Sequence, residues 1–115
     1  MDAFNRQYVL GDFVTGVAAA GTTAATATAL PADHCYVSTV AAGADGVILV
    51  QTRDGMMKTV ANAVDTVSSV VALKVYPWSG AAFNGQTADE ALVLPAGKGA
   101  LFFCHTPTKI TAIFS

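Results

Sequence analysis

The feature that most constrains this chain is a series of short runs rich in valine and threonine, cut by turn-forming residues at short intervals. β-Branched residues fit a pleated, half-buried surface better than a helix, and such spacing is typical of a sandwich or barrel. The pattern predicts an all-β fold, an antiparallel β-sandwich of which the jelly roll is one form. Strands are expected over residues 22–29, 34–40, 46–52, 56–62, 70–76, 91–94, 100–105 and 109–114.

Turn residues separate these runs. Asp54-Gly55 joins two apolar runs and is a strong hairpin signal, because glycine tolerates the positive φ of a tight turn. Asn84-Gly85 is a second dipeptide of this kind. Proline breaks no ladder between strands, where its missing N–H is not needed. The four prolines all fall between expected strands: Pro31, Pro77, Pro95 and Pro107.

Two runs are apolar without alternation, at residues 47–50 and 101–104. Continuous apolar strands are buried on both faces, either in the middle of a packed structure or under a partner. Residues 71–76 instead alternate, as in a strand with one face in water.

The first twenty residues contain apolar side chains with no partner strand nearby, among them Phe4, Tyr8 and Phe13. This segment is either a strand that adds to the same core or an extended arm that reaches a neighbouring subunit. Exposed aromatic residues on a free tail would be a liability, which favours the arm. The expected division is an N-terminal arm over residues 1–20 and a β-sandwich domain over residues 21–115.

Charge is scarce. Charged residues make up 12% of the 115 residues, whereas roughly 25% is typical. A small monomer usually stays in solution by means of many surface charges, so we expect part of this surface to be covered, most simply by copies of the same chain. The six basic residues are scattered and the net charge is −2, which argues against nucleic-acid binding.

Neither a membrane span nor a targeting signal is visible. No apolar stretch approaches the roughly 18 residues needed to cross a bilayer. The first residues lack a basic region followed by an apolar run. Synthesis in a cytoplasm is therefore expected, with Cys35 and Cys104 as reduced thiols.

Four residues could suggest chemistry: the neighbours His34-Cys35 and the neighbours Cys104-His105. Adjacent residues on a strand point to opposite faces, whereas zinc sites use pairs spaced by two to four residues. Cys104 also lies in an apolar run, which raises a thiol pKa and makes it inert. No nucleophile elbow or phosphate-binding loop occurs. The sequence therefore predicts no enzyme, metal, cofactor or small-molecule substrate.

Trp78 follows a proline at an expected turn. It is a cap on the core, an anchor in an interface, or a platform for stacking a sugar. The residues singled out for interaction are Phe4, Tyr8, Phe13, Tyr76, Trp78 and Phe83.

Two motifs stand out by their order and spacing: the strand end Leu73-Lys74-Val75-Tyr76-Pro77 and the turn Pro95-Ala96-Gly97-Lys98 that enters the next strand. With residues 39–43, 45–49 and 81–85 they resemble a family of small virion proteins of tailed bacteriophages, from about residue 22 to the end of the chain. The resemblance implies a β-sandwich, often jelly-roll-like. Such proteins are capsid cement or decoration proteins, often homotrimers, or modules of tails and fibres.

The resemblance and the low charge together predict a structural virion protein that binds and stabilises the phage head shell. Its expected partners are the major capsid protein and two further copies of itself, on the outer capsid surface after assembly in the host cytoplasm. The arm and one sandwich edge are expected to contact the coat protein. The alternatives are a tail or fibre module that stacks host glycans on Tyr76, Trp78 and Phe83, and a plain neck or tail subunit.

Overall fold

Strands and turns make up the structure, a computed structural model that describes residues 12–40, 45–63 and 72–114. These residues contain no helix, which confirms the prediction of an all-β fold. The strands of this part of the chain are β1 (Phe13–Ala18), β2 (Thr28–Ala29), β3 (His34–Thr39), β4 (Gly46–Ile48), β5 (Met56–Asn62), β6 (Leu73–Tyr76), β7 (Ala82–Phe83), β8 (Leu92–Leu94), β9 (Gly99–Thr106) and β10 (Lys109–Phe114).

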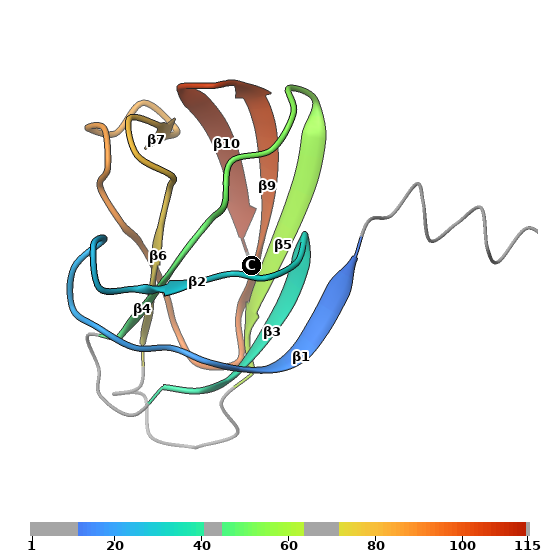
Figure 1. Cartoon of the computed structure of the whole chain (residues 1–115), viewed down its shortest axis with the longest axis vertical. Coiled ribbons are helices and arrows are strands. Elements are labelled where there is room, and N and C mark those ends of the chain that lie inside the picture. The colour runs from blue at the N-terminus through green and yellow to red at the C-terminus, as the bar shows by residue number, and fades with distance from the viewer. Residues whose placement is uncertain (1–11, 41–44, 64–71, 115) are drawn as a thin grey trace, which may run out of the picture.

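The strands form two sheets that lie on opposite sides of a shared core (Figure 1). The six-stranded sheet has the order β1-β3-β5-β9-β10-β7, and the four-stranded sheet has the order β2-β4-β6-β8. Each strand from β1 to β8 is followed by a strand in the other sheet. The chain therefore winds as a coil around the core instead of folding back within one sheet.

The direction of the strands follows from this winding. β1, β3 and β5 are parallel, and so are β2, β4 and β6, which gives three turns of a solenoid-like coil. β8 and β9 then pair antiparallel with β6 and β5, and β10 returns antiparallel to β9. The sheets are mixed, so the expectation of antiparallel sheets is wrong for the parallel half of the structure.

Asp54-Gly55 shows why the expectation failed. The dipeptide does form a turn, and Gly55 has the positive φ of 84° that was expected. The strands on either side of it, β4 and β5, belong to different sheets and do not pair. The Gly55 N–H donates to the Cys104 carbonyl at 2.6 Å, so the turn is held against the end of β9. The predicted hairpin is an arch that crosses from one sheet to the other.

The core lies between the sheets. Val37, Val60 and Phe102 enter it from the six-stranded sheet, and Val75 and Leu94 enter it from the four-stranded sheet, all of them almost fully buried. Large apolar side chains from both sheets therefore meet without space for solvent, and their burial supplies most of the stabilisation.

Two polar residues of β5 also face inward. The Lys58 Nζ lies 3.1 Å from the Asp33 Oδ1, which gives the buried ammonium the anionic partner that it needs. The Asn62 side-chain amide donates to the Leu94 carbonyl at 2.9 Å and so links the two sheets. In the part of the chain that the structure describes, no buried side-chain nitrogen or oxygen lacks a hydrogen-bond partner.

The described portion of the N-terminal segment, residues 12–20, forms the edge strand β1 and its end. Val17 and Ala19 are buried in the core, and the Ala19 N–H donates to the Thr39 carbonyl at 2.8 Å. These residues follow the alternative of a strand that adds to the same core. Phe4 and Tyr8 lie outside the described residues.

Two phenylalanines test which side of the six-stranded sheet is packed. Phe102 is fully buried, whereas 72% of the Phe13 side chain is exposed. We expect Phe102→Ala to lower the free energy of unfolding by about 3–5 kcal/mol and Phe13→Ala to lower it by less than about 1 kcal/mol. Urea unfolding of the dilute protein, followed by circular dichroism, measures both. Equal losses would show that Phe13 is packed like a core residue.

Candidate functional site

The four residues that could suggest chemistry are divided between the two faces of the six-stranded sheet. Cys35 and Cys104 point inward and are buried, whereas His34 and His105 lie on the outer face. The His34 Nδ1 is 2.8 Å from the Thr59 Oγ1 on the neighbouring strand. Among the described residues, no three histidine, cysteine or acidic side chains are placed to hold a metal ion.

Both cysteines are free thiols in the core. Burial raises the pKa of the Cys35 thiol and that of the Cys104 thiol, because a thiolate would lose its hydration there. A raised pKa leaves less of the nucleophilic thiolate at neutral pH. This environment is that of a structural cysteine.

Three of the aromatic residues that were predicted to contact a partner lie in the C-terminal half of the chain, and all three are buried: Tyr76, Trp78 and Phe83. The Tyr76 hydroxyl donates to the Thr22 carbonyl at 3.1 Å, and the Trp78 indole N–H donates to the Pro107 carbonyl at 2.8 Å. Phe83 is fully buried, with its ring centroid 5.2 Å from that of Phe102.

The prediction that Tyr76, Trp78 and Phe83 are surface contacts is therefore wrong. Each ring is used inside the fold, and a sugar cannot stack on a ring that the core already covers. Trp78 is the cap on the core that was one of its three interpretations. Phe13 is the only predicted interaction residue that the described part of the chain leaves exposed.

A different set of side chains is exposed on the outer face of the six-stranded sheet. The strand at residues 101–104 was expected to be buried on both of its faces. Only Phe102 and Cys104, on its inner face, are buried. Phe103 is 37% exposed and Leu101 is half-buried, because they alternate to the outer side. Neighbouring strands add further large apolar side chains to this side: Phe13 on β1, Tyr36 on β3 and Ile113 on β10.

Charge is almost absent from this face. Of the residues in its strands, only Lys58 and Lys109 are charged, and Lys58 points inward to Asp33. Lys109 stands at the end of the face, next to the turn between β9 and β10. An acidic residue occurs in none of these strands. The face therefore has the low charge and the exposed aromatic residues that characterise the centre of a protein interface.

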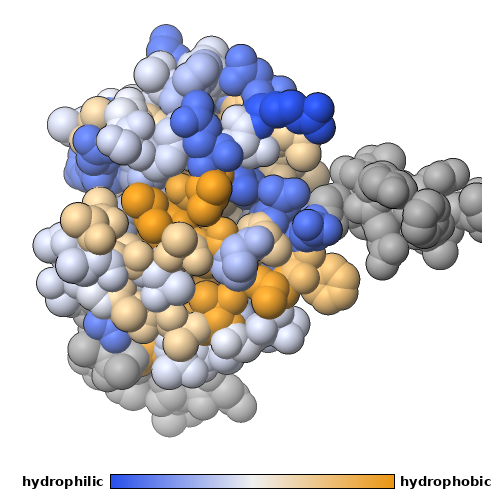
Figure 2. All heavy atoms as spheres, viewed as in Figure 1, coloured by the Kyte–Doolittle hydropathy of each residue, from blue (hydrophilic) through white to orange (hydrophobic). Residues whose placement is uncertain are grey.

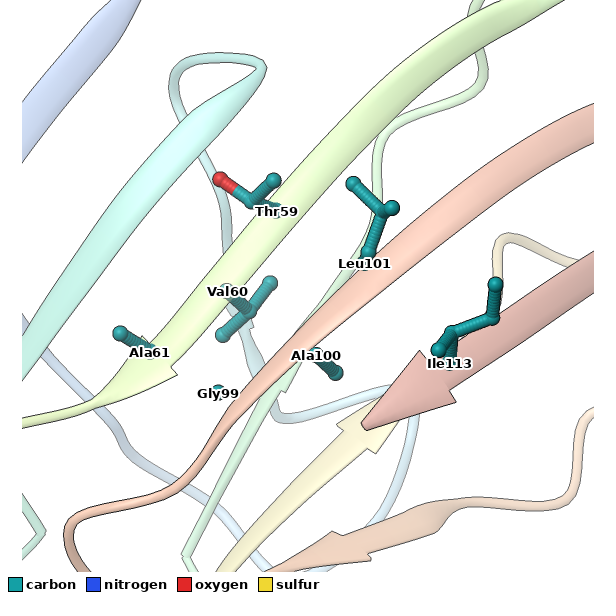
Figure 3. Close-up of a pocket in the computed structure, with 7 residues that line it drawn as sticks. All are labelled: Thr59, Val60, Ala61, Gly99, Ala100, Leu101 and Ile113. Atoms are coloured by element: carbon teal, nitrogen blue, oxygen red, sulfur yellow. The ribbon is translucent and has the colours of Figure 1, made fainter. Parts of the chain in front are cut away.

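Two hollows lie side by side on the outer face. The first is between β1, β3 and β5, and Phe13 and Tyr36 are among its lining residues. The second is between β5, β9 and β10, with Leu101 and Ile113 in its lining (Figure 3). Thr59 and Ala61 line both hollows, so the two are adjacent across the strands. We call them together the outer trough.

The remainder of the described surface is more mixed. Val93 on the outer side of the four-stranded sheet is 53% exposed, but it stands beside Lys74 on a strand of only three residues. In the view of Figure 2, hydrophobic residues gather in the middle and lower part of the described surface and hydrophilic residues in the upper part. The outer trough is therefore the candidate functional site.

Comparison with known proteins adds no assignment. No protein family, curated protein or solved structure matches the chain. The described residues include no helix that could cross a membrane.

Proposed function

We propose that this domain is a structural subunit that assembles with copies of itself through the outer face of its six-stranded sheet. The observation that carries the proposal is the outer face of low charge, which presents Phe13, Tyr36, Phe103 and Ile113 to solvent. Exposed apolar side chains that gather on one face mark an interaction surface. The short supply of charge over the whole sequence supports the same role.

The size of the face suits such a contact. It is formed by five neighbouring strands, in the order β1-β3-β5-β9-β10. At the usual strand spacing they cover about 24 Å, and strands of this length run for about 20 Å. This flat area of roughly 480 Å², before the relief of the side chains is added, is over half of the ~800 Å² that one partner gives to a standard interface.

The resemblance to small virion proteins supports a particular assembly. We propose a homotrimer that decorates the outer surface of a bacteriophage capsid and binds the major capsid protein. A protein that binds only the expanded shell stabilises that form by mass action. A rigid two-sheet scaffold suits this role. The three residues that were expected to stack glycans, Tyr76, Trp78 and Phe83, belong to the core and so do not support glycan recognition.

A charge placed on the outer face tests the assembly. Ile113 and Val93 have nearly the same exposure, 55% and 53%, but lie on the outer sides of different sheets. We expect Ile113→Glu to weaken self-association at least tenfold, because a buried carboxylate without a partner is costly, and Val93→Glu to leave it unchanged. Sedimentation equilibrium measures both. Equal behaviour of the two variants would rule out this face as the contact.

The position in the virion is tested separately. Quantitative mass spectrometry of purified particles gives the copy number of the protein relative to that of the major capsid protein. Decoration of the shell predicts comparable copy numbers. A few copies per particle would indicate a neck, tail or fibre subunit instead, and absence from the particle would overturn the virion role.

A further inference from the structure

We infer that the outer trough holds residues 1–11 of a neighbouring copy, so that the subunits of the oligomer exchange their N-terminal segments. The inference deepens the proposed self-association and rests on it. It names what covers the face: a segment that precedes β1 and contains Phe4 and Tyr8.

The shape of the outer trough favours a chain segment with large side chains. Its two hollows are centred on β3 and on β9, with β5 between them. Ala61 and Gly99 contribute almost no side chain there, whereas Leu101 and Ile113 are large (Figure 3). Tyr36, a large side chain, lines the other hollow. A small floor between large walls leaves room for aromatic rings from another chain.

The spacing in the N-terminal segment fits the two hollows. β3 and β9 are two strand spacings apart, or about 10 Å. Phe4 and Tyr8 are four residues apart, which corresponds to about 6 Å in a helix and about 13 Å in an extended chain. The separation of the hollows lies between these two values, so a segment that is partly extended can place one ring in each hollow. The eleven residues reach up to about 36 Å when extended, which exceeds the ~24 Å width of the face.

The charge of the segment is also compatible with the face. Arg6 lies between Phe4 and Tyr8 in the sequence. The strands of the face present one cation, Lys109, and that residue stands at the far end next to the β9–β10 turn. Tyr36 offers an exposed ring on which a guanidinium can stack.

A neighbouring copy supplies this segment more readily than the same chain does. The Asp12 carbonyl accepts a hydrogen bond from the His34 N–H at 2.9 Å, so the ladder between β1 and β3 already includes Asp12. A segment that returned over its own sheet would have to reverse direction within residues 9–11, the three residues between Tyr8 and Asp12. It would then have to pass Phe13, whose exposed side chain lines the β1 side of the outer trough.

Cross-linking between two full-length variants tests the exchange. Tyr8→Cys is introduced in one preparation and Leu101→Cys in a second, and the two are mixed and treated with a short bismaleimide. Linked dimers of the two variants are expected, because the native thiols Cys35 and Cys104 are buried. Replacing the second partner by Val93→Cys is expected to reduce the yield at least tenfold. A double variant that carries Tyr8→Cys and Leu101→Cys in the same chain serves as a check, and linkage confined within single chains of it would overturn the exchange. Equal yields with Leu101→Cys and with Val93→Cys as the second partner would overturn it too.

A second comparison separates this inference from the proposed function. Phe4→Ser with Tyr8→Ser is expected to weaken self-association at least tenfold, whereas Asn5→Ser with Gln7→Ser leaves it unchanged. If Ile113→Glu dissociates the oligomer and the Phe4/Tyr8 variant does not, the face is an interface but the segment is not its occupant. If neither dissociates it, both proposals fail.

Discussion

The packing of Phe102 and its inward neighbours against the four-stranded sheet determines the rest of the structure. Because successive side chains of a strand point to opposite faces, burial of Phe102 places Leu101 and Phe103 on the outer side. The same alternation, repeated on β3 and β10, leaves Tyr36 and Ile113 exposed on this outer side as well. The described residues form only two layers, and in the proposed assembly another chain supplies a third.

The positions of most strands could be predicted from the sequence, because they depend on local composition. β7 was not expected, and β1 lies in the segment assigned to the arm. Residues 34–40, 100–105 and 109–114 were expected to form strands and match β3, β9 and β10 closely. The pairing could not be predicted in the same way. A turn such as Asp54-Gly55 uses the same residue types and backbone conformation whether the chain folds back within a sheet or crosses to the other sheet. Residues 22–29 gave only the short β2, because Thr23 and Thr26 bond to each other in a turn.

The site was harder to predict than the fold. Tyr76 and Trp78 were expected at the surface because they stand at a strand end and a turn, but their polar atoms find backbone carbonyls inside the fold. Tyr36, Leu101 and Ile113 were not singled out, although a signal existed. A run such as residues 101–104, apolar at every position, was expected to lie inside the fold or under a partner. The structure buries one side of that run and leaves the other side exposed. This is the state expected of a strand that a partner covers, when the partner is absent.

In the proposed assembly, the outer face of the six-stranded sheet becomes covered. Hydroxyl-radical labelling with mass spectrometry measures this directly, by comparing the protein diluted to single chains with the assembled protein. We expect labelling of Tyr36 and Phe103 to fall several-fold on assembly, while labelling of Val93 on the other sheet stays the same. Labelling of Tyr36 and Phe103 that does not change with assembly would contradict the proposed assembly.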